Sequence, residues 1–166
     1  EWYNHVDPTP TDYGTVTIRN NLVFGVGGSY LIQTNVRYDA GLTKAPILNQ
    51  VIENNTIDAF DFSSSLPFRS AITGTWVSGT MVFKNNIVIA RRTSGLAVVV
   101  AFDPTFDTLS CDYNHYYAPA ADGTSQIFSI ALAIKTASQW LALGYDANGI
   151  SYNSGWTAPV FTNAPT

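Results

Sequence analysis

The sequence predicts an all-β chain of stacked repeats, and two observations lead to this fold class. An Asn-Asn pair recurs inside a hydrophobic frame, and in the fourth copy the pair has become Tyr113-Asn114. The second asparagine falls at positions 21, 55, 86 and 114, so the spacings are 55 − 21 = 34, 86 − 55 = 31 and 114 − 86 = 28 residues. A recurrence of roughly 20 to 50 residues is typical of stacked repeat architectures. Stretches rich in Gly and Pro separate the copies, as turns do.

Residues around the asparagines align in columns that predict which side chains point inward. Side chains alternate faces along a strand, so each copy is interpreted as two short strands hinged at the asparagines. Asparagine tolerates the left-handed backbone of a sharp corner, and stacked carboxamides can hydrogen-bond along the stacking axis. The predicted inward columns are Ile18, Ile52, Phe83 and Cys111, and then Val23, Ile57, Val88 and Tyr116.

A charged column indicates how the copies are arranged. Two residues before the second asparagine, the charge alternates in sign through Arg19, Glu53, Lys84 and Asp112. In a parallel stack with about 4.8 Å between strands, every charge faces its opposite. Each such pair contributes a few tenths to about 1 kcal/mol. Parallel stacking is therefore favoured over four unrelated turns of an antiparallel sandwich, which would leave the alternation unexplained.

Three further strands would supply the remaining sides of the repeats. They are predicted near Tyr30–Val36, Ala71–Val77 and Leu96–Phe102. An extended segment is also predicted near the end of the chain, around Ala158–Phe161.

A short helix is predicted over residues 137–143. Thr136 and Gln139 have the spacing of a capping box, and Gly144 stops the helix. We expect this helix to pack on the repeats through Trp140 and Leu143.

Composition excludes several classes of function. No apolar run approaches the roughly 18 residues of a membrane span. The net charge of −4 argues against binding nucleic acid, which calls for a basic surface. Cys111 is the only cysteine, so an internal disulfide and a thiolate metal cluster are both excluded, and its inward column predicts a buried apolar side chain. Only 12% of residues are charged, a style common in extracellular β proteins, and we expect a secreted or cell-surface protein.

The chain resembles a known family. The asparagine-hinged repeats, the 112–117 and 136–146 stretches, Ser151, and Pro159-Val160-Phe161 with Asn163 resemble the C-terminal half of right-handed parallel β-helix proteins, the pectate-lyase-like superfamily. The resemblance implies a solenoid of about four to five coils over residues 1–130, with one short helix and an extended closing segment over 131–166. It also implies a fragment or a short form, whose open ends another protein segment or chain covers, because bare ends expose strand edges.

Enzymes of this superfamily suggest a catalytic set. Members are often lyases or hydrolases of acidic polysaccharides, with carboxylates, a basic residue and sometimes calcium in a groove. Candidate catalytic residues are Asp58, Asp61, Arg91 and Arg92. Asp61 and Arg92 share a column, six residues after their asparagines (61 − 55 = 6, 92 − 86 = 6). A lyase needs a base for the proton α to a uronate carboxylate and a cation beside that carboxylate. The alternative is a surface ion pair worth at most about 1 kcal/mol.

Aromatic and histidine side chains are candidates for sugar binding. Tyr30, Trp76 and Tyr117 could stack on sugar rings if they are exposed, whereas burial in the core is the alternative. His115 is a further candidate for carbohydrate binding, and the alternative is a surface histidine between aromatic neighbours. As a general base, His115 would need an orienting carboxylate, and Asp112 is the nearest in sequence.

No metal site is predicted. The acidic residues beside His5 are irregularly spaced for a metal, although calcium at Asp103 and Asp107 remains an alternative.

Two functions follow from these observations. The first is an extracellular carbohydrate-active β-helix that binds or cleaves an acidic polysaccharide, by β-elimination if it is a lyase. The alternative is a non-catalytic structural, adhesive or fibre/spike module whose coil ends pack on a partner chain. A groove where carboxylates converge with Lys or Arg would favour the first, and contacts at the ends of the stack would favour the second.

Overall fold

A computed structural model describes residues 2–4, 12–25, 30–37, 47–59, 66–73, 79–90, 98–102, 106–118, 126–131 and 133–149. These residues form fourteen strands and one short helix. The strands are β1 (Trp2–Asn4), β2 (Asp12–Arg19), β3 (Leu22–Gly25), β4 (Tyr30–Arg37), β5 (Ile47–Glu53), β6 (Thr56–Ala59), β7 (Leu66–Thr73), β8 (Thr80–Lys84), β9 (Ile87–Ala90), β10 (Val100–Phe102), β11 (Thr108–Asp112), β12 (His115–Tyr117), β13 (Gln126–Ile130) and β14 (Ala133–Thr136). The helix is α1 (Ala137–Ala142), and the described part is thus mostly β, as the sequence predicts.

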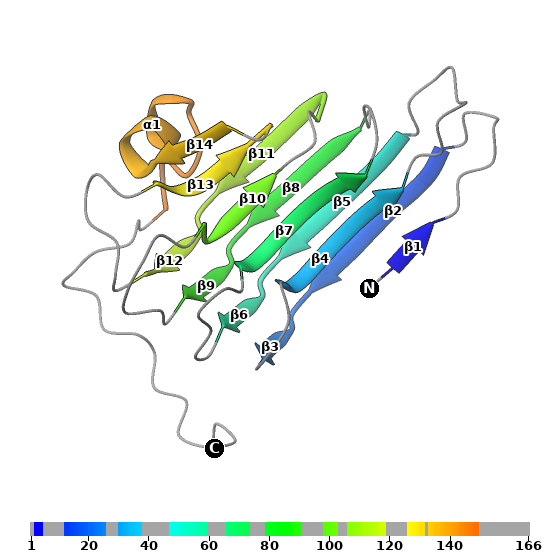
Figure 1. Cartoon of the computed structure of the whole chain (residues 1–166), viewed down its shortest axis with the longest axis horizontal. Coiled ribbons are helices and arrows are strands. Elements are labelled where there is room, and N and C mark those ends of the chain that lie inside the picture. The colour runs from blue at the N-terminus through cyan, green and yellow to red at the C-terminus, as the bar shows by residue number, and fades with distance from the viewer. Residues whose placement is uncertain are drawn as a thin grey trace.

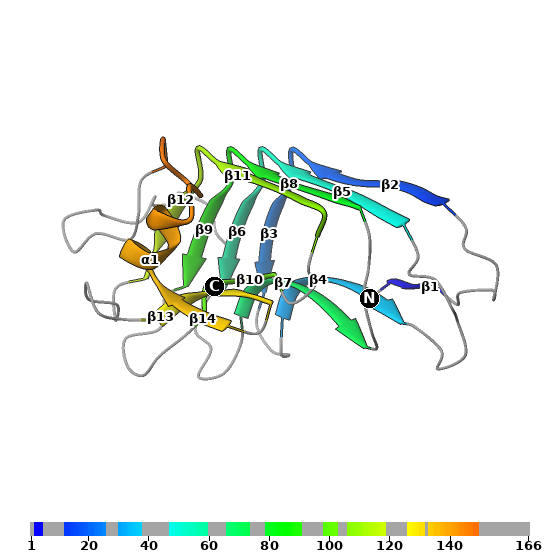
Figure 2. The same cartoon turned by 90° about the horizontal axis from the view of Figure 1, so that it is seen from above.

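The strands form three sheets (Figures 1 and 2). Sheet 1 has the order β1-β4-β7-β10-β13-β14, sheet 2 the order β11-β8-β5-β2, and sheet 3 the order β12-β9-β6-β3. All strand pairs are parallel except β13 with β14. Three consecutive strands give one strand to each sheet. Each such group is a repeat: β2–β4, β5–β7, β8–β10 and β11–β13.

The strand register confirms the predicted parallel stacking. Arg19 pairs with Glu53, Glu53 with Lys84, and Lys84 with Asp112. The Arg19 guanidinium lies 3.4 Å from the Glu53 carboxylate. The antiparallel sandwich is therefore wrong for these strands, and the alternating charges do face their opposites along one row of sheet 2.

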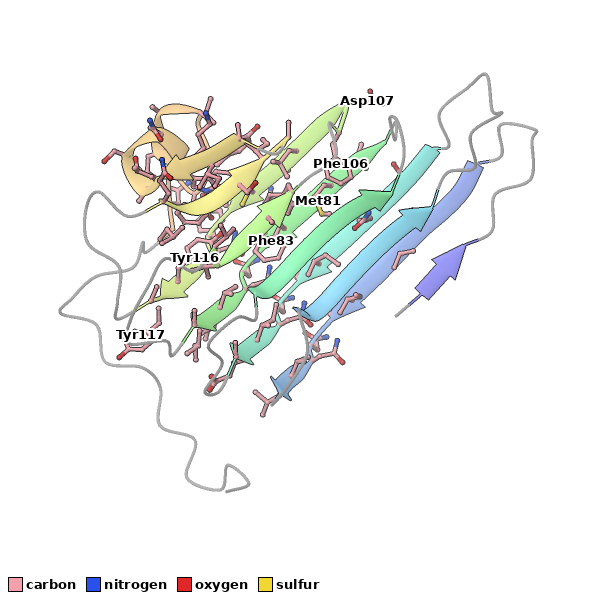
Figure 3. The ribbon with its side chains drawn as sticks, viewed as in Figure 1. Met81, Phe83, Phe106, Asp107, Tyr116 and Tyr117 are labelled. Carbon is pink, nitrogen blue, oxygen red and sulfur yellow. The ribbon has the colours of Figure 1, made fainter. Side chains whose placement is uncertain are left out.

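The predicted inward columns form the core. Figure 3 shows Met81, Phe83 and Tyr116 in the interior between the sheets. Burial is nearly complete in the last three repeats, whereas Ile18 and Val23 of the first repeat are only partly buried. The fully buried members of the two columns are Ile52, Phe83, Cys111, Ile57, Val88 and Tyr116.

Helix α1 begins as predicted and packs differently from the prediction. Thr136 Oγ1 accepts from the Gln139 N–H at 3.3 Å, and the Thr136 N–H donates to Gln139 Oε1 at 2.9 Å. Trp140 is buried, but Leu143 is 50% exposed, so its predicted packing role is wrong. Leu143 is the C-cap and lies beyond the last helical turn, so it does not extend the buried face. In the described part of the chain, no helix is long and apolar enough to cross a membrane.

One predicted strand is shifted in the structure, and another is described only in part. Strand β7 spans Leu66–Thr73 and overlaps the predicted Ala71–Val77 over three residues only. Its position follows from pairing with β4, where Leu66 faces Tyr30, rather than from local composition. Within the described residues β10 begins at Val100, and the extended segment predicted at 158–161 lies outside them.

Candidate functional site

The second asparagines of the repeats form a continuous hydrogen-bonded ladder. The backbone N–H and the Nδ2 of Asn21 both donate to Asn55 Oδ1, at 3.0 and 3.1 Å. Asn55 donates in the same way to Asn86 Oδ1, with both distances 3.1 Å. Asn86 then donates to Asn114 Oδ1 at 2.9 and 3.0 Å. The ladder therefore has a direction, because each asparagine donates to the one after it.

The side-chain amide of each inner asparagine has a second hydrogen, which it donates to the preceding repeat. Nδ2 donates to the backbone carbonyl of the inward residue there, at 2.8 to 2.9 Å. The pairs are Asn55 with Ile18, Asn86 with Ile52, and Asn114 with Phe83. These three asparagines are at most 1% exposed. Their burial is tolerated because every polar atom of the carboxamide has a partner.

The first residue of each pair makes the corner. Asn20, Asn54 and Asn85 have φ of 58°, 57° and 55°, and Tyr113 has φ of 59°. This left-handed region is unfavourable for most residues with a Cβ and is tolerated best by asparagine. The two asparagines of a pair thus have separate roles, since the first turns the chain and the second carries the ladder.

The ladder ends on a buried carboxylate, Asp146. Its Oδ1 accepts from the backbone N–H and the Nδ2 of Asn114, at 3.2 and 2.8 Å. Its Oδ2 accepts from Trp140 Nε1 at 2.9 Å, the Tyr116 hydroxyl at 2.8 Å and the Cys111 thiol at 3.2 Å. An ionised carboxylate suits this place because it only accepts hydrogen bonds. Asp146 lies 32 residues after Asn114 and so occupies the position of a fifth rung.

Cys111 and Tyr116 serve this end as hydrogen-bond donors. Burial raises the pKa of the Cys111 thiol well above its ordinary value of 9.0, and the neighbouring Asp146 charge adds to the rise. Burial likewise raises the pKa of Tyr116. A protonated, buried thiol is a poor nucleophile, as the inward column of Cys111 predicts.

Helix α1 and the turn over 143–149 cover this end of the ladder. The Trp140 ring stacks on Phe128, with centroids 4.8 Å apart. The Asp146 N–H donates to the Cys111 carbonyl at 2.8 Å, so the turn continues the edge of sheet 2. Asn148 donates its backbone N–H and its Nδ2 to the two Asp112 carboxylate oxygens, both at 2.9 Å, and these bonds lower the Asp112 pKa. Strand β14 covers the edge of sheet 1 at the same end (Figure 1).

The other end of the ladder is open. Asn21 is exposed, and its Oδ1 accepts no hydrogen bond from the described residues. Its Nδ2 donates to the Arg19 carbonyl of its own repeat at 2.9 Å. The interior is open as well, because Val16 is 38% exposed whereas Gln50 and Met81, which follow it in the same row, are at most 1% exposed. Strands β2 and β3 are edge strands here (Figure 2).

The predicted catalytic residues are not brought together in the described part of the chain. Asp58 is in β6 and is buried, with 2% exposure, so it does not lie on an open face. Asp61, Arg91 and Arg92 lie outside the described residues, and their role remains a prediction.

The structure describes the side chains of two of the four predicted sugar-binding residues. His115 and Tyr117 are partly exposed on β12, and the Asp112 carboxylate binds Asn148 and the Tyr113 N–H. Tyr30 begins β4, but its side chain is not among those described, and Trp76 lies outside the described residues.

No group of three or more His, Cys, Asp or Glu side chains in the described ranges is arranged to hold a metal ion. Asp107, just before β11 (Figure 3), accepts the Gly79 N–H at 2.9 Å, which is a contact between successive repeats. Its predicted calcium partner Asp103 and the three N-terminal candidates His5, Asp7 and the Asp12 side chain are not described.

An exposed polar row was not anticipated from the sequence. On the outer face of sheet 2, Thr15 pairs with Asn49, and Thr80 with Thr108. Hydrogen bonds join these two pairs into one row, since the Thr80 N–H and hydroxyl donate to Asn49 Oδ1, at 3.0 and 2.9 Å. A column of polar residues four before Lys84 and its equivalents would have been the signal.

Comparison with protein-family models, with curated proteins and with solved structures finds no match for this chain.

Proposed function

We propose that the four repeats are coils of a right-handed parallel β-helix and that the chain is a non-catalytic structural module of a secreted or cell-surface protein. The module closes one end of the β-helix and receives a further repeat at the other. Parallel pairing in three sheets with the same strand sequence supports the coils. The right hand follows from the general handedness of connections between parallel strands.

The observation that carries this proposal is the difference between the two ends of the ladder. Asp146 satisfies the last asparagine with two hydrogen bonds, and α1 covers the core beside it. At the other end, Asn21 and the apolar Val16 face solvent, and β2 and β3 are unpaired on one side within the described part. Open edges and an open core are a liability unless another segment covers them.

A repeat supplied in trans tests this function. The probe is a synthetic peptide of residues 47–59, which contains a complete strand, corner and strand. We expect it to bind the full chain, and amide NMR shifts to concentrate in β2 and β3 rather than in β11 and β12. Absence of binding, or binding at the covered end, would refute the function.

The matched control blocks the edge without disturbing the fold. The Asn20 N–H and the Ile18 carbonyl both face β5, so the Thr17 N–H faces the free edge. Thr17→Pro therefore removes an outward donor, a substitution that edge strands tolerate. This variant should retain its stability and lose peptide binding, whereas Thr17→Ala should keep both.

The polar row favours a second function, binding or cleavage of an acidic polysaccharide on the face of sheet 2. Thr15, Asn49, Thr80 and Thr108 offer hydroxyl and amide groups at the regular spacing of parallel strands, and Arg19 and Lys84 lie on the same face, four residues further along their strands. Incubation with a panel of uronic-acid polysaccharides, with and without calcium, tests it. Binding or an unsaturated product would support this function, and neither binding nor product with any polysaccharide of the panel would exclude it.

A further inference from the structure

The inner rungs of the ladder define what a preceding repeat must supply. Asn86 shows the full set of contacts. Its Oδ1 accepts the N–H and the Nδ2 of Asn55, both at 3.1 Å, and its own Nδ2 donates to the Ile52 carbonyl at 2.9 Å. A preceding repeat therefore contributes a ladder carboxamide that donates and, three residues earlier, a backbone carbonyl that accepts.

Asn21 lacks both contributions within the described part of the chain. Its Oδ1 has no donor there, and its Nδ2 turns back to the Arg19 carbonyl at 2.9 Å instead of reaching a preceding strand. Asn21 Nδ2 therefore bonds within its own repeat, where the inner asparagines bond to the preceding one. Asn21 has the form of an inner rung, and no preceding rung lies beside it within the described residues.

The charged row defines the partner further. Its signs alternate from Arg19 to Asp112, and Arg19 is its exposed end, with 54% of the side chain accessible. An acidic residue on the free side of Arg19 would continue the alternation, whereas a basic residue would be repelled. The open interior beside it, formed by Val16, Ile18 and Val23, requires apolar side chains from the same partner.

A second copy of the chain does not meet these requirements. The donors of Asn114 are already used on Asp146, and the turn over 143–149 occupies the edge beside it. The donors of Asn21 are used on Asn55. Neither end of another copy therefore presents a free ladder carboxamide to Asn21 Oδ1.

We infer that the N-terminal end of the stack binds, in parallel register, a strand–corner–strand segment of another polypeptide that carries an acidic residue two positions before a ladder asparagine. The ladder carboxamide donates to Asn21 Oδ1, the acid lies beside Arg19, and a strand carbonyl accepts from Asn21 Nδ2. This inference rests on the proposed function and adds the chemical identity of the partner.

Peptides related by single changes test this recognition. The segment 47–59 has the required pattern, with Glu53 in the charged column and Asn55 as the ladder asparagine. The wild-type peptide and its E53K and N55A variants are titrated into the full chain at low salt, and Kd is obtained from amide shifts of β2 and β3. We expect E53K to weaken binding about fivefold and N55A about tenfold.

Exchanging the charges of residue 19 in the chain and residue 53 in the peptide is the decisive experiment. The Arg19→Glu chain should bind the E53K peptide more tightly than the wild-type peptide, and added salt should reduce both preferences because the pair is exposed. Equal affinity of all three peptides for β2 and β3 would overturn the inference while leaving the proposed function intact. Failure of every peptide to bind would overturn both.

Discussion

The two ends of the asparagine ladder use the same chemistry and reach opposite outcomes. At one end, Asn114 donates twice to Asp146, a carboxylate that also holds Trp140, Tyr116 and Cys111. At the other end, Asn21 receives no contact from a preceding repeat within the described residues, and its Nδ2 donates to Asn55 and to the Arg19 carbonyl. The difference teaches that each repeat needs hydrogen bonds from both of its neighbours. The stack ends where a carboxylate side chain, which only accepts hydrogen bonds, replaces a carboxamide, which both donates and accepts them.

The largest effect is expected where the ladder is closed. Asp146→Ala leaves several buried donors without an acceptor, and we expect the free energy of unfolding to fall by about 4 kcal/mol. Asp146→Asn keeps an oxygen for Asn114 but turns an amide toward Trp140 Nε1, so it should lose about half as much. Urea denaturation measures both. A loss below about 1 kcal/mol for Asp146→Ala would mean that this carboxylate does not hold the end.

An inner rung should matter more than the open one. Asn86→Ala removes three ladder bonds and one bond to a strand carbonyl in a fully buried place, and should cost about 3 kcal/mol of unfolding free energy. Asn21→Ala removes the two bonds that Nδ2 of this exposed side chain donates, and should cost about 1 kcal/mol. Equal losses in urea denaturation would contradict the difference between the ends.

Alkaline pH should weaken the closed end selectively. The folded state raises the pKa values of Cys111 and Tyr116, so it binds protons that the unfolded state releases. Stability is therefore unaffected below pH 9.0, the ordinary pKa of the thiol, and declines as pH rises above it, by about 1.4 kcal/mol per pH unit from the thiol. Cys111→Ala should make the decline shallower, as urea midpoints at several pH values would show. An unchanged slope would count against a buried, protonated thiol.

The smallest effect is a gain. Tyr113 occupies the left-handed corner that asparagine takes in the other repeats. Tyr113→Asn should raise the unfolding free energy by about 0.5 kcal/mol because asparagine adopts this backbone more readily. Tyr113→Ala serves as the control and should give no gain, and an equal gain would assign the effect to loss of the exposed ring instead.

Much of the scaffold could be predicted because it depends on local periodicity. The spacing of the asparagines, the inward columns and the alternating charges each constrain one strand pair, and the register follows from them. The start of α1 was predictable for the same reason, since a capping box is a local signal. Strand β7 was misplaced because its limits are set by pairing with a distant strand.

The closing residue could not be recognised as easily. Asp146 lies in a turn-forming segment, and nothing local shows that its carboxylate is buried and receives the ladder. Its distance of 32 residues from Asn114, close to the repeat spacing, is the signal that would have identified it. Burial of Asp58 was likewise invisible, because alternation along β6 predicts only which face a side chain occupies.

Hydrogen exchange of the four ladder amides tests the central claim most directly. The backbone N–H groups of Asn21, Asn55, Asn86 and Asn114 make equivalent bonds, each to an oxygen of the next rung. Exchange protection in the isolated chain, measured by NMR, should be lowest at Asn21 and higher at the three buried rungs, since edge positions open locally. Addition of the 47–59 peptide should raise protection at Asn21. Protection of Asn21 equal to that of Asn114 without any peptide would contradict an open end.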